Sequence, residues 1–370
     1  MKLYTQLKHS LFCYLFITFI SLFIFASFIS SVFSQDVDNS SQQIPTGIDR
    51  IDAEPTSTTP RSIDVDVAIL DSGIDANHPD LNVLIDKQVN FIGDDPSDNC
   101  GHGTHIAGII GAKDNDIGVV GVAPNATIWN IKVMEKNFTD PKGSCPVNYD
   151  AVIKGLKFLL QNADSIDVAN LSFSFMCIDF CNAIQVTEIE NLINQIIDRG
   201  VVVIVSAAND GVNAIKIVPA MLQMPITVSA MSDTDGKCGG LGPLSEEWEV
   251  THERMKDDTF ANISNYGTVI DISAPGVDIL STFPGGLYQN MTGTSFAAPH
   301  VTGTAALIIA SHEGILPTNV RNMLLEFGSN KSVECDGHGY GYFTNDKDPF
   351  PEPLLYAKKF KLQDPTNLAP

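Results

Sequence analysis

The chain has 370 residues, which is enough for one large domain with short extensions or for two small domains. Its 44 acidic residues outnumber its 22 basic ones, for a net charge of −22, and this balance argues against a nucleic-acid-binding protein, which needs a basic face. Apolar residues make up 44% of the chain, so a sizeable core can be buried. The acidity either keeps a secreted protein soluble or supplies carboxylates that bind cations, and both can hold.

The N-terminus has the pattern of a targeting segment. Basic residues precede an apolar run, residues 11–33, that contains no charge. Val32 and Ser34 occupy the −3 and −1 positions of a cut before Gln35, so we expect residues 1–34 to be a signal peptide. Because the apolar run is also long enough to span a bilayer, a retained signal anchor is the alternative. In either case we expect the rest of the chain to be exported.

Alternating and β-branched apolar runs predict strands, and apolar residues at helical spacing predict helices between them. The predicted strands cover residues 65–71, 126–134, 168–172, 201–205, 226–231 and 269–273. The predicted helices cover residues 102–112, 148–162, 188–197, 295–311 and 318–327. This alternation indicates an α/β fold, a three-layer sandwich in which helices cover both faces of a central, mostly parallel sheet. The polar stretch 236–256 predicts a surface loop, and the Pro-rich stretch from Asn345 predicts a tail that wraps the protein or hangs free.

Three short segments carry a carboxylate, an imidazole and a hydroxyl. The first, Asp-Ser-Gly-Ile-Asp, begins at Asp71 where a predicted strand ends. The other two, Gly-His-Gly-Thr-His and Gly-Thr-Ser-Phe-Ala-Ala-Pro-His, open predicted helices and contain His102 and Ser295. A serine hydroxyl needs a positioned base, histidine can take and return its proton near neutral pH, and a carboxylate can orient the imidazole. The set therefore indicates nucleophilic acyl transfer at the carboxyl ends of the strands.

In this order, the three segments resemble the active-site motifs of the subtilisin family of serine peptidases. The resemblance covers nearly the whole exported chain. It implies a subtilisin-like peptidase domain over residues 42–345, followed by a C-terminal tail at 346–370. It also implies a serine endopeptidase, a hydrolase, whose catalytic triad is Asp71, His102 and Ser295.

Residues around these motifs resemble the family's oxyanion and substrate-binding positions. Asn209 follows a predicted buried strand and would donate to a tetrahedral oxyanion together with the backbone N–H of Ser295. Ala208 and Ser174 stand where the family usually has glycine, which puts the shape of the main specificity pocket in question. A substrate would bind as an added β-strand. By resemblance, its contacts are Cys145, Pro146, Val147, Tyr149, Ser172, Phe173, Ser174 and Ala208.

The segment Lys-Asp-Asn-Asp-Ile-Gly-Val at 113–119 resembles the loop that forms the family's tight calcium site. Calcium prefers six to eight oxygen ligands, many of them backbone carbonyls. By resemblance, two amide side chains, one carboxylate and three carbonyls would hold a structural Ca²⁺, namely Gln42, Asn115, Asp80, Lys113, Ile117 and Val119. The alternative is a plain polar turn.

Six of the seven cysteines follow the targeting segment, and an even count in an exported chain indicates disulfides. The sequence alone does not choose among their 15 pairings, and no cysteine spacing supports a zinc site instead. Some secreted subtilases bridge a cysteine two residues before the catalytic histidine to one beyond the next strand. A second pair here lies close enough to join locally, which leaves two more cysteines. The pairs we expect are Cys100–Cys145, Cys177–Cys181 and Cys238–Cys335, the alternative for Cys100 being a redox-sensitive thiol.

One feature differs from most secreted subtilases. Only a short extension, residues 35–41, separates the targeting segment from the peptidase domain, which is too little for the folded pro-domain that usually assists folding. We therefore expect an enzyme that folds unaided, one that is helped in trans, or a truncated gene product.

The function expected from the resemblance is hydrolysis of peptide bonds in protein or peptide substrates by a secreted monomer. A membrane is a partner only if the N-terminal segment is retained as an anchor. Three other functions compete: a non-enzymatic subtilisin-like binding protein, a membrane-tethered processing protease, and a transpeptidase that excludes water from the same acyl-enzyme. The usual mark of the binding protein is a lost triad residue, and none is lost here.

Overall fold

A computed structural model of the protein describes residues 41–55, 63–93, 95–139, 145–176, 183–248 and 251–360. The expected signal segment 1–34, nearly all of the extension 35–41, and the end of the tail, 361–370, lie outside these described residues. The expected Cys177–Cys181 pair also lies outside them. Within the described ranges, no helix is long and apolar enough to cross a bilayer.

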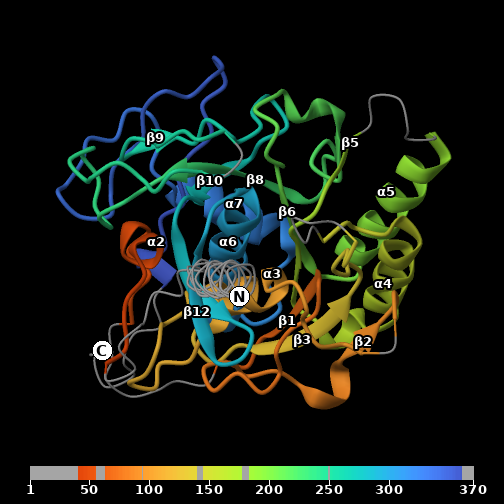
Figure 1. The fold of residues 1–370 in the computed structure, drawn as a ribbon. Helices are drawn as coiled ribbons and strands as arrows, with labels where there is room; N and C mark the ends of the chain where they lie inside the picture. Colours follow the sequence, from red (N-terminus) through yellow and green to blue (C-terminus); the bar gives the residue numbers. More distant parts are fainter. Residues whose placement is uncertain are drawn as a thin grey trace, which may run out of the picture. The chain divides into compact units, whose positions relative to one another are not determined.

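Helices and strands alternate along the described chain (Figure 1). The α-helices are α2 (Thr46–Arg50), α3 (His102–Gly111), α4 (Tyr149–Gln161), α5 (Ala183–Asp198), α6 (Thr294–Ser311) and α7 (Pro317–Phe327). The strands are β1 (Asp66–Asp71), β2 (Val89–Asn90), β3 (Thr127–Lys132), β4 (Val168–Leu171), β5 (Phe175–Met176), β6 (Val202–Ser206), β7 (Ile217–Val218), β8 (Ile226–Ser232), β9 (Thr259–Phe260), β10 (Ile272–Pro275), β11 (Ile279–Phe283) and β12 (Leu287–Met291). Short 3₁₀ turns are η1 (Ile85–Lys87), η2 (Ala163–Ser165), η3 (Ala214–Lys216) and η4 (Lys358–Phe360).

A central sheet has the strand order β10-β8-β6-β4-β1-β3-β2, and β9 pairs with β8 at its side. The pairs along this order are parallel, whereas β9 is antiparallel to β8. Parallel neighbours need crossover connections, and α3, α4 and α5 lie in the segments between successive strands. The predicted mostly parallel sheet is therefore confirmed.

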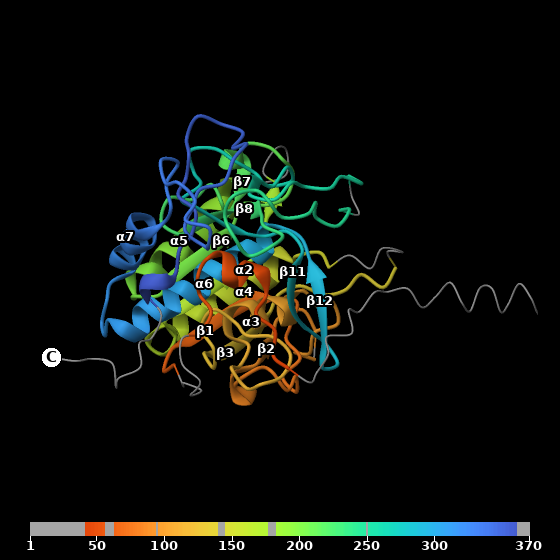
Figure 2. The ribbon, with the colours of Figure 1, turned by 90° about the vertical axis from the view of Figure 1, so that its left-hand side faces the viewer.

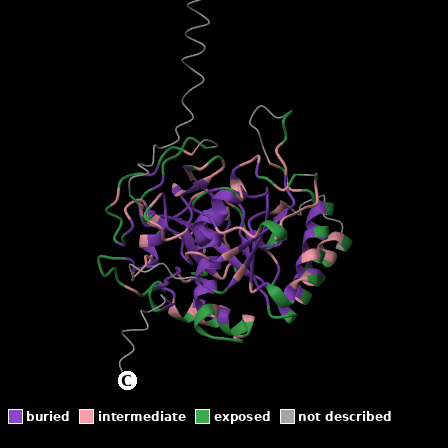
Figure 3. Ribbon diagram, turned by 90° about the horizontal axis from the view of Figure 1, so that it is seen from below, coloured by how far each residue is buried: buried purple, intermediate pink, exposed green. Residues whose placement is uncertain are grey.

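The strands are apolar on both sides, so both faces of the sheet are buried. Along β1, Val67 and Ile69 belong to a core shared with α3, α6 and α7, whereas Ala68 and Leu70 belong to one shared with α4 and α5. This separation follows from the two-residue period of a strand. Figures 1 and 2 show the helices on the two sides of the sheet, and Figure 3 shows the buried centre they enclose. The predicted three-layer α/β sandwich is confirmed.

Most predicted elements are present with small shifts at their ends. The prediction of a strand over 269–273 is wrong in its first half, because Val269 and Ile270 form a turn that packs against a separate small cluster, and β10 begins only at Ile272. The helix expected over 188–197 begins earlier, at Ala183. Sequence analysis also missed the β11–β12 hairpin.

The C-terminal segment packs against the domain as far as Phe360. Leu354 forms a parallel bridge with Ser273 on the exposed edge of β10, and Leu355 joins the core that contains α6 and α7. Of the two arrangements expected for the tail, wrapping therefore holds for this part. The boundary expected at residue 345 does not mark the end of the packed structure.

A buried arginine joins α2 to two distant segments. Arg50 is fully buried, and its guanidinium lies 2.7 Å from the carboxylate of Asp258. It also donates to the carbonyls of Gly339 and Gly341. The disulfide between Cys238 and Cys335 joins the same two segments covalently. Removing one partner of a buried ion pair typically costs about 3–5 kcal/mol, so Arg50 stabilises the packing of the C-terminal part of the chain.

The ionisation of Glu352, in this C-terminal segment, should make the stability of the protein depend on pH. Its side chain is buried and accepts a hydrogen bond from the Ser229 hydroxyl. Burial raises the pKa of Glu352 from 4.5 to about 7, so the folded protein holds a neutral carboxyl group where the unfolded chain is already ionised. The free energy of unfolding should therefore fall as pH rises from about 4.5 to 7.

We predict that Glu352→Gln removes this dependence, because glutamine keeps the acceptor oxygen and does not ionise. The variant should be more stable than wild type at pH 8 by about 1–3 kcal/mol, with little difference at pH 4.5. Thermal melts at the two pH values measure this. A difference in melting temperature that is the same at both would show that ionisation of Glu352 is not the cause.

Candidate active site

The end of β1 and the start of α3 bring a carboxylate and an imidazole together. His102 Nδ1 lies 2.7 Å from Asp71 Oδ1. The Asp71 side chain is 1% exposed, whereas 21% of the His102 side chain remains exposed. A neutral imidazole that donates from Nδ1 to the carboxylate keeps Nε2 as an acceptor. His102 can therefore take a proton on its other nitrogen, Nε2.

Two opposing effects set the protonation of His102. Burial lowers its pKa, but the charge and hydrogen bond of Asp71, together with the charge of Asp98, outweigh burial and raise the pKa above its usual value. Two neighbouring histidines behave differently. Burial lowers the pKa of His105 to about 3 and that of His300 to about 4, so both are neutral at physiological pH. His102 is therefore the one of these three suited to proton transfer.

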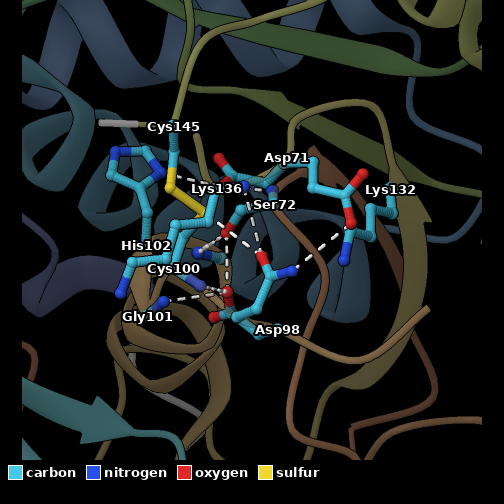
Figure 4. The surroundings of a disulfide bond; sticks show 12 residues. Asp71, Ser72, Asp98, Cys100, Gly101, His102, Lys132, Lys136 and Cys145 are labelled. Carbon is cyan, nitrogen blue, oxygen red and sulfur yellow. Dashed lines mark hydrogen bonds and ion pairs between the residues drawn. A yellow bond between two sulfur atoms is a disulfide. The ribbon is translucent and has the colours of Figure 1, made fainter. Parts of the chain in front are cut away.

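Asp98 holds the start of α3 in place. Its Oδ1 accepts hydrogen bonds from the backbone N–H groups of Cys100 and Gly101. Its Oδ2 accepts two more, from the backbone N–H and the hydroxyl of Thr104. The Ser72 hydroxyl donates to Oδ1 as well, which ties the residue after Asp71 to the same carboxylate. Figure 4 shows Asp98 beneath the loop that leads to the candidate histidine.

Ser295 is the second residue of α6, and a proline frees its carbonyl. Pro299 has no N–H to donate to the carbonyl four residues earlier. The Ser172 hydroxyl donates to the Ser295 carbonyl instead, at 2.9 Å. In return, the Ser295 hydroxyl donates to the Ser172 carbonyl at 3.2 Å. The carboxyl end of β4 is thus locked to the start of α6.

The residue after Ser295 contacts the imidazole of His102. The ring of Phe296, the residue after Ser295, lies 5.2 Å from the ring of His102, centroid to centroid. Among the hydrogen bonds of the described residues, none joins Ser295 to His102. Such bonds are often long when no substrate is bound, so the arrangement remains compatible with proton transfer between them.

Asn209 follows β6 and reaches the start of α6. Its Oδ1 accepts a hydrogen bond of 2.8 Å from the backbone N–H of Thr294, so the amide presents Nδ2 as its donor. Ala208, just before it, has a positive φ of 73°, which the usual glycine would adopt without strain. The structure therefore places the expected oxyanion residue beside Ser295, on a main chain held in an unfavourable conformation.

Aromatic contacts connect residues of the two expected substrate edges. Residues 172–174 continue from the carboxyl end of β4, and residues 145–147 precede α4. The ring of Phe175 contacts both sides, since its centroid is 6.1 Å from Phe173 and 6.2 Å from Tyr149. These rings therefore belong to the apolar core that is shared with α4 and α5.

A disulfide joins one of these edges to the histidine loop. Cys100, two residues before His102, is bonded to Cys145, as expected (Figure 4). At the other end of this edge, Val147 forms an antiparallel bridge with Met134. Pro146, between Cys145 and Val147, is exposed. The edge that begins at Cys145 is thus fixed at both ends.

The residues expected to bind calcium gather around Asp80. This side chain is fully buried, and its Oδ2 accepts hydrogen bonds from the Val119 N–H at 3.0 Å and the Tyr288 hydroxyl at 3.2 Å. Its Oδ1 is buried without a hydrogen-bond partner. Gly118 has a φ of 57°, and a Cβ at this position would lie 2.6 Å from Asp80 Oδ2. A buried carboxylate oxygen that accepts no hydrogen bond is suited to binding a cation.

Carbonyl and amide groups complete this set. The Gln42 amide lies 2.6 Å from the Lys113 carbonyl and 3.2 Å from the Val119 carbonyl. If this amide group is rotated by half a turn, its oxygen takes the place of its nitrogen and faces the same two carbonyls. The Asn115 side-chain oxygen accepts from the N–H of Ile117, which closes the loop. The donor set is rich in neutral and anionic oxygen, and it fits calcium.

Sequence analysis missed several residues that build this site. Asp98 lies three residues before Gly101, the N-cap residue of α3, so the usual capping position did not indicate it. Asn170, which donates to the Ser172 hydroxyl, had no sequence signal beyond its place in a predicted strand.

A cluster of three acidic side chains lies elsewhere in the described part of the chain. One carboxylate oxygen of each residue lies within 4.8 Å of the others, and the residues are Asp233, Asp235 and Asp257. A group of this kind does not by itself define a metal site.

Comparison with known proteins places the chain among relatives. The model of the subtilase family, peptidase family S8, matches residues 62–342. Subtilisin NAT of Bacillus subtilis subsp. natto is 33% identical over 290 residues, which cover 76% of this chain and 65% of that protein, just under two thirds of its length. A subtilisin of Bacillus pumilus is 33% identical over 290 residues, covering 90% of its length. A solved structure of a cold-adapted subtilisin-like serine proteinase has a TM-score of 0.63, with 26% identity, and covers 86% of this chain and 98% of its own.

The contact between Asp71 and His102 yields a prediction that does not depend on activity. In Asp71→Asn the opposing charge is gone while burial remains, so the pKa of His102 should fall below its wild-type value. An NMR titration of the imidazole signals measures it. Asp75→Asn removes a carboxylate from the same motif without touching His102 and should leave this pKa nearly unchanged. An unchanged pKa in Asp71→Asn would contradict the assigned contact.

Proposed function

Since this chain belongs to the subtilase family, we propose that it is a secreted serine endopeptidase that hydrolyses peptide bonds through an acyl-enzyme on Ser295. The observation that carries the proposal is the 2.7 Å contact between Asp71 and His102 at the edge where α6 presents Ser295. The start of α6 reaches the same place, since the ring of Phe296, next to Ser295, lies 5.2 Å from the His102 ring. A carboxylate bound to an imidazole beside the helix that carries a serine supports a triad.

The proposed reaction follows from the proton acceptor and donors of the site. The Ser295 hydroxyl leaves its 3.2 Å contact with Ser172, gives its proton to His102 Nε2 and attacks the scissile carbonyl carbon. Asp71 stabilises the imidazolium that forms. Asn209 Nδ2 and the backbone N–H of Ser295 donate to the oxyanion. His102 then protonates the leaving amine, and a water molecule releases the acyl group by the same steps in reverse order.

The proposed substrate is an extended segment of a protein or peptide. Residues 172–174 and 145–147 are two edges between which such a segment could add as a strand. The apolar core that contains Phe173, Phe175 and Tyr149 lies at these edges, which favours apolar side chains in the substrate. The two disulfides suit an oxidising compartment, which supports secretion.

We further propose that the loop at 113–119 binds a structural calcium ion together with Gln42 and Asp80. The ion would neutralise a buried carboxylate and hold the segment before α2 against this loop. Its role would be stability, because Asp80 is not among the residues around Ser295.

The nucleophile is tested by labelling the full chain with a fluorophosphonate probe. We predict that wild type is labelled and Ser295→Ala is not, because only an activated serine reacts. Asn209→Ala should lower kcat on a peptide substrate by about 10²–10³-fold with a small change in KM, since it removes a donor used in the transition state. Equal labelling of Ser295→Ala would overturn the proposal.

The calcium site is tested by stability. Chelation should lower the melting temperature and added calcium should restore it, since ligand at about 100 times its Kd stabilises by about 2.7 kcal/mol. Asp80→Asn should lose most of this response. Asp116→Asn is a matched control, because it removes an exposed charge from the same loop without touching the proposed ligands. An equal response in Asp80→Asn and wild type would contradict the site.

A further inference from the structure

The turn after β6 has a conformation that its own residues do not favour. Ala208 has a φ of 73°, in the left-handed region that residues with a side chain rarely adopt. Its side chain is buried in a small cluster with Ala214, Ile217 and Ala220. Strained backbone of this kind persists only where the surroundings fix it, and it collects at functional sites. Something outside residues 207–212 must therefore hold this turn.

Asn265 supplies that support from a segment more than 50 residues away. It is completely buried. Its Nδ2 donates to the Ala207 carbonyl at 2.8 Å, and its backbone N–H donates to the Ala208 carbonyl at 3.0 Å. Its Oδ1 accepts from the N–H groups of Asp210, at 3.1 Å, and Val212, at 2.9 Å. These four contacts are all with the main chain of the turn, and they lie on both sides of Asn209.

The side-chain amide of Asn209 has little room to move. Its Oδ1 is bound to the Thr294 N–H at 2.8 Å, and a Cβ on Gly293 would lie 3.1 Å from its Nδ2. The amide therefore occupies a narrow space between the turn and the start of α6. A donor must lie about 2.7–3.1 Å from the position of the oxyanion to stabilise it, so a small shift of the turn would remove the interaction.

From these contacts we propose that Asn265 is a positioning residue for catalysis, which holds the turn 207–212 so that Asn209 Nδ2 faces the oxyanion. The inference rests on the proposed function, in which Asn209 is an oxyanion donor. Asn265 does not touch the substrate edges described above. Its loss should therefore lower kcat and change KM little, because the oxyanion forms only after binding.

A double-mutant cycle tests the proposal in the full chain. Asn265→Ala should lower kcat by about 10–100-fold, less than the loss of the donor itself, with KM within about threefold of wild type. In an Asn209→Ala background the same substitution should change kcat by less than about twofold, because no amide is left to position. Ser229→Ala is the control, since it also removes a buried hydrogen bond but in the contact with Glu352, and its effect on kcat should be small in both backgrounds.

The cycle separates this inference from a purely structural role. If Asn265→Ala does not fold, Asn265→Asp replaces it, because aspartate keeps an acceptor for the Asp210 and Val212 amides and loses the donor to Ala207. Equal losses of kcat in both backgrounds, or a change confined to KM, would overturn the inference while leaving the proposed function intact. If Asn209→Ala itself leaves kcat unchanged, the oxyanion role of Asn209 and this inference fall together.

Discussion

The buried carboxylate of Asp98 is the contact on which the candidate site depends. The first N–H groups of a helix have no partner within the helix, and in α3 that of Thr104 donates to Asp98 while that of Gly103 donates to the Ser72 hydroxyl. The N–H groups of Cys100 and Gly101, in the loop that leads into α3, also donate to Asp98. The same carboxylate accepts from the Ser72 hydroxyl, next to Asp71 at the end of β1. Hydrogen bonds to an ionised acceptor are stronger than neutral ones. The distance between Asp71 and His102 is therefore set by a residue that belongs to neither element.

The same principle places the other groups. Pro299 leaves the Ser295 carbonyl without its helical partner, and Ser172 supplies one. Asn170 donates a hydrogen bond to the Ser172 hydroxyl. Its own Oδ1 accepts one from the hydroxyl of Thr302, about two turns after Ser295 in α6. Unpaired main-chain groups at helix starts and turns thus serve as attachment points for buried side chains. The chain satisfies polar groups it could not leave buried and, in doing so, fixes the groups that would react.

Local periodicity was enough to predict the mostly parallel sheet and its helices, because burial of alternating residues such as those of β1 is a local property. The motifs around Asp71, His102 and Ser295 were also readable, since each is contiguous. Asn265 was not, because its partners lie more than 50 residues away and a lone asparagine has no local signal. The hairpin β11–β12 was missed although two glycines separate its apolar runs. The packed C-terminal segment depends on tertiary contacts that a Pro-rich sequence does not reveal.

The two carboxylates near His102 differ in what they can do. Asp71 accepts the imidazole N–H directly, so it fixes both the tautomer and the orientation of the ring. The two oxygens of Asp98 accept five hydrogen bonds, none of them from His102. Asp98 therefore acts on the His102 ring only through its charge. Both charges favour the imidazolium, but only Asp71, through its hydrogen bond with Nδ1, determines that Nε2 is the nitrogen left to accept a proton from the serine. Orientation and charge are therefore divided between two residues, and rigidity at Asp98 is what allows Asp71 to direct the proton.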